Sequence, residues 1–449
     1  MALQGLKLSE LIGSLSHALD ITEGQPEGHC VRCCWIGMHV GHEIGLSDRA
    51  LWELYYTLLL KDLGCSSNAA RICELYLTDD LSFKRDFKWV DGSLNQALRF
   101  VLNHTGLQAG LADRFKRVVN VFRHSDDFAQ ELIQTRCQRG ADIARKLRFG
   151  EGVAEAVHAL DEHWDGSGRP DGRQGESIPL NARIALLAQV VDVFHTVGEI
   201  DAAMQEVRKR SGSWFDPELV RAIESIVKRS DFLSMLNSEA LDSAVFALEP
   251  AQFEIPLDDD YLDEIAAAFG QIVDAKSPYT QGHSVRVADY ADGVALELSL
   301  TNTRRRWLKR GALLHDVGKL GVSNAILDKP DRLEADEWTA VKRHADYTGS
   351  ILGRIGIFEE MARVSSAHHE RLDGAGYPLG LKAEAIELET RIITVADIFD
   401  AITAERPYRA AIPVPRTLEI MSEQVDIAID HHCFEALKRV APRMHQSDE

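Results

Sequence analysis

Seven residues in the second half of the chain have side chains that can bind divalent metal ions: His283, His315, Asp316, His344, His368, His369 and Asp397. Histidine nitrogens and carboxylate oxygens are ligands for iron, manganese, cobalt and zinc, and an aspartate can bridge two ions. His315 and Asp316 are adjacent, so on a helix their side chains point about 100° apart. One of the two side chains can therefore bind a single ion, while the other bridges two ions. The pattern indicates a metal centre.

Helices are the elements that must position these side chains. Apolar residues recur at spacings of three and four in residues 287–298 and 308–315, and no sustained alternation predicts a strand. Gly318 predicts that a helix ends next to Asp316, where the backbone opens toward a site. Asp397 lies in an apolar segment typical of a buried helix, where a carboxylate needs a partner such as a metal ion. The predicted fold class is all-α.

The chain contains an internal repeat. Residues 282–286, Gly-His-Ser-Val-Arg, lie 254 positions after residues 28–32, Gly-His-Cys-Val-Arg. Residues 373–378 match residues 165–170 at a smaller offset of 208, so the first copy holds about 46 additional residues. Two tandem helical-bundle domains are the simplest explanation.

Length and composition agree with two domains. The chain has 449 residues, of which 45% are hydrophobic, enough for two cores. Pro250, Pro256 and an acidic run predict a linker at residues 238–260, which separates domains at residues 1–237 and 261–449.

The first copy lacks most of the candidate ligands. His29 and Asp62 match His283 and Asp316, but the other matching positions hold Lys61, Arg136, Leu160, Asp161 and Gln189. Cations and an apolar side chain at these positions exclude a pair of metal ions. We expect this domain to pack on its twin or to regulate it. Its additional residues, with Phe83, Phe87, Trp89 and the amphipathic segment 107–122, could contact a signalling protein, a second copy or a small molecule, although core packing explains any single aromatic equally well.

Charge and cysteine content restrict the class of protein. A net charge of −20 argues against binding to polymeric nucleic acid, which requires phosphate neutralisation. The basic cluster at residues 304–310 is expected to be a solvated helix face. No leader and no membrane-spanning apolar run is recognised, and the seven cysteines lack regular spacing, so we expect a cytoplasmic protein without a membrane role.

Five motifs in order resemble the HD-GYP subgroup of HD-domain phosphohydrolases. They are residues 315–319 (His-Asp-Val-Gly-Lys), His344, residues 368–378 (His-His-Glu-Arg-Leu-Asp-Gly-Ala-Gly-Tyr-Pro), Asp397 and residues 406–409 (Arg-Pro-Tyr-Arg). The resemblance covers about residues 260–440. It implies two tandem HD-type helical bundles, of which the second is a metal-dependent phosphodiesterase that opens cyclic di-GMP; some members of the subgroup act on cyclic GMP-AMP.

The resemblance also implies how the ligands are shared. One divalent ion would be held by His283, His315, Asp316 and Asp397, and a second, bridged by Asp316, by His344, His368 and His369. Iron or manganese is the expected metal. Two ions about 3.5–4 Å apart would hold the phosphodiester and activate the water that attacks phosphorus.

Further roles follow from the same resemblance. Asp316 and Lys319 are assigned to catalysis, and Lys319 would offset charge that develops on the phosphoryl oxygens. Arg406 and Arg409 would contact phosphate. Tyr377 is assigned to substrate binding, although a rigid turn without chemistry explains its loop. At position 279, where some members have a glutamate that helps to hold a third ion, this chain has a tyrosine, so we expect two ions.

The leading functional hypothesis is hydrolysis of cyclic di-GMP to linear pGpG, with further cleavage to GMP left open. One alternative keeps the hydrolase but changes the substrate to 3′,3′-cyclic GMP-AMP or a linear nucleotide. Another is a signalling scaffold that binds a cyclic dinucleotide without cutting it. Asp373 and Asp400 are further carboxylates that could orient the metal ligands.

Overall fold

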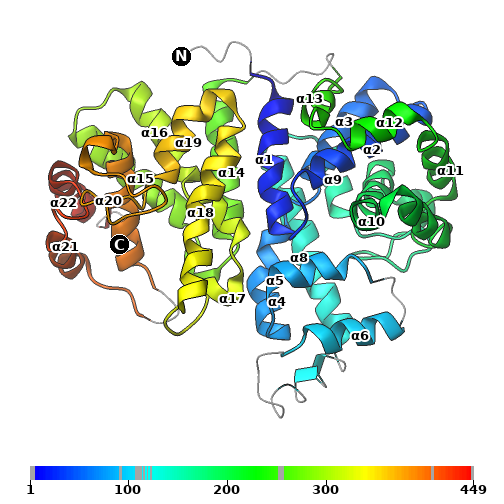
Figure 1. The fold of residues 1–449 in the computed structure, drawn as a ribbon, viewed down its shortest axis with the longest axis horizontal. Coiled ribbons are helices and arrows are strands. Elements are labelled where there is room, and N and C mark those ends of the chain that lie inside the picture. Colours follow the sequence, from blue (N-terminus) through cyan, green and yellow to red (C-terminus); the bar gives the residue numbers. More distant parts are fainter. Residues whose placement is uncertain are drawn as a thin grey trace. The chain divides into compact units, whose positions relative to one another are not determined.

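The computed structural model describes residues 6–90, 94–106, 114, 117–118, 120–121, 124–250, 257–405 and 409–445. Over these residues the regular elements are helices and no strand is present, apart from three isolated bridges. This confirms the all-α fold class. The chain forms two compact units, Met1–Asp258 and Asp259–Glu449, each made of helices (Figure 1).

The first unit is a helical bundle in which α2 packs against α1, α3 and α10. Its described α-helices are α1 (Leu8–Thr22), α2 (His29–Glu43), α3 (Asp48–Leu60), α4 (Ala69–Tyr76), α5 (Asp80–Phe87), α6 (Leu94–His104), α8 (Ser125–Lys146), α9 (Glu151–His158), α10 (Leu180–Lys209), α11 (Pro217–Ile226), α12 (Ser230–Leu236) and α13 (Leu241–Phe246). By length and composition α10 could cross a membrane, but 67% of its most apolar window is buried and its helical geometry breaks at Gly198 and Glu199. It fits the core helix of a bundle.

Part of the predicted linker is helical. Residues 241–246 form α13, which packs against α1 and α2 and buries Leu241 and Val245. These two side chains are four residues apart and lie on one face of the helix. The expected start of the linker at residue 238 is therefore wrong, because one short apolar face adds another turn of structure to the first unit. Residues 251–256 lie outside the described residues.

The additional residues of the first copy include α4, α5 and α6 and share a small hydrophobic core. Phe83 is buried in this core, whereas Phe87 is 45% exposed. Trp89 packs edge-on against Phe194 with ring centroids 4.6 Å apart. Packing therefore accounts for Phe83 and Trp89. Most of the expected amphipathic segment 107–122 lies outside the described residues.

The second unit is a bundle around α15, which packs against α16, α20 and α22. Its described α-helices are α14 (Asp259–Asp274), α15 (His283–Glu297), α16 (Asn302–Leu314), α17 (Asn324–Leu327), α18 (Ala335–Gly353), α19 (Glu359–Ser366), α20 (Leu388–Thr403), α21 (Val414–Ser422) and α22 (His431–His445). The Thr301 hydroxyl accepts a hydrogen bond from the Arg304 N–H at the start of α16 (3.3 Å), which satisfies a backbone donor that the helix cannot pair.

The two units begin corresponding helices in the same way. Gly28 precedes α2 with φ of 83°, and Gly282 precedes α15 with φ of 71°. Both values lie in the left-handed region, which glycine adopts without a steric penalty. The first residue of each helix is a buried histidine, His29 or His283. The backbone geometry thus repeats at the offset found in the sequence.

The basic cluster at residues 304–310 is neutralised within the second unit. Each cation contacts carboxylates: Arg304 contacts Glu360 and Glu389, Arg305 contacts Asp292, Arg306 contacts Asp260 and Asp263, Lys309 contacts Asp289, and Arg310 contacts Asp259 and Asp263. These ion pairs leave little positive potential for a phosphate backbone.

Candidate metal centre

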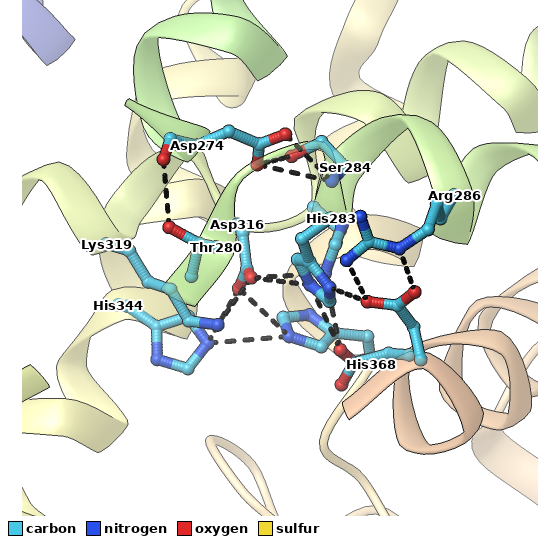
Figure 2. A network of polar contacts seen from close by, with 12 residues as sticks. Asp274, Thr280, His283, Ser284, Arg286, Asp316, Lys319, His344 and His368 are labelled. Carbon is cyan, nitrogen blue, oxygen red and sulfur yellow. Dashed lines mark hydrogen bonds and ion pairs between the residues drawn. The ribbon is translucent and has the colours of Figure 1, made fainter. Parts of the chain in front are cut away.

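The second unit brings the predicted ligands together from several helices. His283 is the first residue of α15, His315 directly follows α16, and Asp316 is next in the chain. His344 lies inside α18 and Asp397 inside α20, while His368 and His369 follow α19. Figure 2 shows His283, Asp316, His344 and His368 pointing toward one another.

Three histidines are held in a common orientation by the backbone. Each has its Nδ1 atom within hydrogen-bond distance of a carbonyl oxygen three residues earlier: His315 with Ala312 (2.7 Å), His344 with Val341 (2.6 Å) and His368 with Ser365 (2.6 Å). An Nδ1–H that donates to a carbonyl leaves the Nε2 lone pair free to bind a metal ion. These backbone contacts favour the same tautomer in all three rings and fix the direction of each ring.

Asp316 lies at the centre of the cluster and is 1% exposed. Its Oδ2 atom is 3.4 Å from His283 Nε2 and 3.3 Å from His315 Nε2. Its Oδ1 atom is 3.5 Å from His344 Nε2 and 3.6 Å from His368 Nε2. The two carboxylate oxygens therefore face two different pairs of histidines, which is the arrangement expected of a bridging ligand.

The remaining two predicted ligands complete these sets. The Oδ1 atom of Asp397 is 3.3 Å from His283 Nε2 and 3.8 Å from His315 Nε2. His369 has a ring nitrogen within 4.8 Å of ligand atoms of His344 and His368. All seven candidate residues therefore lie at one site.

The polar atoms of this site are compatible with metal binding. His283 Nε2, His315 Nε2 and Asp316 Oδ1 are buried without a hydrogen-bond partner within the described part of the chain. Burying such groups unpaired is costly, and divalent cations would satisfy them. The donor set of imidazole nitrogens and carboxylate oxygens suits iron, manganese, cobalt or zinc.

The candidate histidine ligands differ in the direction of their pKa shifts. Burial lowers the pKa of His344 and His368, and that of His369 to about 3, so these rings are neutral. Burial opposes the charge of His315 as well, but Asp316 and Asp397 raise its pKa to about 9. A metal ion would have to displace that proton, so binding releases protons.

Asp400 orients His283 from outside the cluster. Its Oδ2 atom lies 2.7 Å from His283 Nδ1, and its Oδ1 atom accepts a hydrogen bond from Arg286 Nε at 2.6 Å. Asp373 instead pairs with Arg371 and accepts from the Ala375 N–H, in the loop that follows the histidines. Of the two carboxylates considered from sequence, Asp400 alone makes these ligand contacts.

The predicted catalytic and substrate-binding residues differ in how closely they approach the metal centre. Lys319 Nζ lies 2.5 Å from Asp316 Oδ2, at the centre (Figure 2). The Tyr377 ring lies 4.8 Å from the His369 ring. The Arg409 guanidinium donates to the carbonyls of Ile402 and Ala401 at the end of α20, so a phosphate contact would use its remaining donors. Arg406 lies outside the described residues.

Glu370 has a role that its place in the motif did not indicate. This carboxylate is buried and accepts hydrogen bonds from the backbone N–H groups of Leu379 (2.6 Å), Gly380 (3.1 Å) and Leu381 (2.8 Å). It thereby holds the loop that carries Tyr377 against the histidines. Glu162 makes the equivalent three bonds in the first unit, so its recurrence at the offset of 208 was the available signal.

Tyr279, which replaces the glutamate of a third metal site, borders the centre. It lines a cavity of about 80 Å³ together with His283, Asp316 and Lys319. Its only side-chain donor atom is the phenol oxygen, a poor ligand while protonated. The expectation of two ions therefore stays a prediction.

Ammonium and guanidinium groups take the place of ligands in the first unit. Lys61 Nζ contacts Asp62 and lies 3.0 Å from His29 Nε2. Although burial opposes its charge, Asp62 holds the pKa of Lys61 well above its ordinary value. Arg136 contacts Asp161 in the same way. Fixed cations at these positions would repel a metal ion, and the absence of a metal site from this unit stays a prediction.

Comparison with known proteins finds similarity in both units of the chain. A family model described as an HD domain matches residues 107–219 and 268–432, one stretch in each unit, which confirms the repeat. The chain is 57% identical to the 3'3'-cGAMP-specific phosphodiesterase 3 of Vibrio cholerae, over 96% of this chain and 94% of that protein. It is 35% identical to the cyclic di-GMP phosphodiesterase response regulator RpfG of Xanthomonas campestris, over 41% of this chain and 49% of that protein.

A solved structure shows the same fold. The crystal structure of a cyclic GMP-AMP-specific phosphodiesterase from V. cholerae, V-cGAP3, has a TM-score of 0.68 and 51% identity. The alignment covers 97% of this chain and 98% of that one. The similarity therefore extends over both units.

Proposed function

The chain belongs to the HD-GYP subgroup of the HD-domain family, and on that premise we propose that its second unit hydrolyses 3′,3′-cyclic GMP-AMP in a metal-dependent reaction. The position of Asp316 carries the proposal, because its two oxygens face separate histidine pairs. The alternative of a scaffold that binds without cutting is disfavoured, since all seven ligand positions converge on one site.

The comparisons favour a substrate other than the leading expectation. The relative that is 57% identical and aligned over 94% of its length is named for cyclic GMP-AMP. Relatives named for cyclic di-GMP, such as RpfG and the 32% identical Thermotoga maritima protein, align with about 40% of this chain. We therefore rank cyclic GMP-AMP above cyclic di-GMP.

The residues of the centre would have distinct tasks. His283, His315 and Asp397 would hold one divalent ion, and His344, His368 and His369 a second, with Asp316 shared between them. Bound metal ions would supply Lewis acidity, which neutralises phosphate charge and lowers the pKa of water. Lys319 is held by Asp316 and would place its positive charge beside the phosphoryl oxygens.

The first unit is proposed to act without metal. Lys61 and Arg136 stand at two of the ligand positions, and Lys88 lies 3.0 Å from the buried carboxylate of Glu23. We propose packing or regulation as its role, with the partly exposed side of the additional residues, including Phe87, as a surface for a protein partner or a second copy.

Substrate choice can be tested directly. Purified protein is reconstituted anaerobically with iron or manganese, and turnover of cyclic GMP-AMP and of cyclic di-GMP is followed separately by chromatography. We expect a kcat/KM at least about tenfold higher for cyclic GMP-AMP, the factor that about 1.4 kcal/mol of discrimination provides. A higher kcat/KM for cyclic di-GMP would support the substrate first expected from the sequence. If neither nucleotide is hydrolysed, the proposed activity is contradicted.

A further inference from the structure

An aromatic and basic rim, which we define as Trp338, Lys342 and Tyr377, borders the metal centre. Trp338 and Lys342 lie one turn apart on α18, the helix that carries His344. Lys342 Nζ is 5.7 Å from the centre of the Trp338 ring and 5.3 Å from that of Tyr377. The Tyr377 ring is 4.8 Å from the His369 ring, so the rim runs from the ligands toward solvent.

Trp338 keeps much of its surface in solvent. It is 46% exposed, and its ring stands edge-on to Tyr377 with centroids 6.3 Å apart. An exposed tryptophan beside a binding site offers a large, rigid apolar ring face to a ligand. A local role exists as well, because the contact between Trp338 and Lys342 on one helix face gives a small cation–π stabilisation. Comparison with the first unit distinguishes a role in ligand binding from a role in helix stability.

The first unit has kept the scaffold but not the rim. At the offset of 208, the positions of Trp338, Lys342 and Tyr377 hold Gln130, Gln134 and Arg169. The corresponding helix α8 is intact, and Gln130 Nε2 donates to the Pro170 carbonyl at 2.7 Å. The helix and loop therefore form without an aromatic rim. The rim is thus present in the second unit, which has the seven candidate metal ligands. Its three residues are replaced in the first unit, which lacks most of those ligands.

We propose that the rim is the substrate-recognition surface of the second unit: Trp338 stacks on one purine base of the cyclic dinucleotide, and Lys342 pairs with the phosphate that is not cut. This inference rests on the proposed function, because it assumes that the other phosphate lies at the metal centre. A purine presents a flat aromatic face, which an exposed indole matches without base-specific hydrogen bonds. The position of Lys342 between two rings restricts where its ammonium can lie and limits its hydration.

The test separates binding from chemistry. Binding of the phosphorothioate analogue of cyclic GMP-AMP, which resists hydrolysis, is measured by calorimetry on metal-loaded protein. Trp338→Ala should weaken this binding by about tenfold, because it removes the stacking of one base on the indole, and Trp338→Phe should recover most of the affinity. Lys342→Met should weaken binding and reduce its dependence on salt.

Two controls isolate the rim. Turnover of bis(p-nitrophenyl) phosphate, a phosphodiester without purine bases, should fall by a smaller factor in Trp338→Ala than the affinity for the nucleotide analogue does, because this substrate has no base to stack on the indole. Gln130→Ala, at the matching position of the first unit, should leave nucleotide binding unchanged. Unaltered affinity in Trp338→Ala, or an equal loss in Gln130→Ala, would overturn the inference. If cyclic GMP-AMP binds in a Trp338-dependent way but is not hydrolysed, the rim is supported as a binding surface. In that case only the proposed function is contradicted.

Discussion

Replacement of Asp400 by asparagine should weaken metal binding without removing any ligand. In the native protein the Asp400 carboxylate is 1% exposed, lies 2.7 Å from His283 Nδ1 and accepts from Arg286 Nε at 2.6 Å. Asparagine has nearly the same shape but no charge, and it can accept through one oxygen only. The His283 ring would then be a weaker base and less firmly oriented.

The expected size follows from that geometry. Loss of a carboxylate that orients a ligating histidine reduces metal affinity by about 10–100-fold, which corresponds to about 1.4–2.7 kcal/mol. The assay is competition for iron or manganese between Asp400→Asn and a chelator of known affinity, with the wild type measured in parallel. Turnover at saturating metal should recover most of the wild-type rate, because all seven proposed ligands remain.

The repeat supplies a matched control. Asp192 makes the same contacts in the first unit, 2.6 Å from His29 Nδ1 and 2.6 Å from Arg32 Nε. Asp192→Asn should therefore leave metal affinity unchanged. Equal metal affinity in Asp400→Asn and wild type would refute the reasoning, and so would an equal loss in Asp192→Asn.

Three further predictions concern other sites. Gly376→Ala would bring a Cβ atom to 2.4 Å from the Arg371 nitrogen and should displace the loop and reduce turnover at least about tenfold, whereas Gly168→Ala, its counterpart, should lower only the unfolding midpoint of the first unit. Lys88→Met leaves Glu23 buried without its ion-pair partner and should destabilise the first unit by about 3–5 kcal/mol in urea unfolding. Despite burial, Lys88 lowers the pKa of Glu23 to about 2, below its ordinary 4.5, so the stability from this pair should be complete above pH 4.5 and decline as the pH falls toward 2. Asp316→Ala should abolish bound metal and turnover together, and retained turnover would exclude the bridging role.

The candidate ligands could be identified from sequence because metal chemistry restricts residue type at each position. His315, His344 and Asp397 are recognisable from their types and order, and the helical periodicity around them predicts the all-α fold. The structure adds that these residues converge. The repeat was equally accessible, since a constant offset needs no knowledge of tertiary contacts.

Other features depend on contacts between distant segments. Asp400 and Arg286 are 114 residues apart, and no local pattern pairs them. The bonds of Glu370 require the loop to bring three N–H groups to one carboxylate. Lys88 lies among the additional residues of the first copy, 65 residues after Glu23, and no local pattern pairs the two, so their contact could not be anticipated.

The most direct test of a dinuclear centre in the second unit is metal content and turnover measured on one preparation. Metal per chain is determined by elemental analysis after anaerobic reconstitution, and the same sample is assayed with cyclic GMP-AMP. We expect about two ions per chain, as in two-metal phosphodiester hydrolysis, together with a linear dinucleotide product. Full turnover with no bound metal, or two bound ions that persist in Asp316→Ala, would contradict the account.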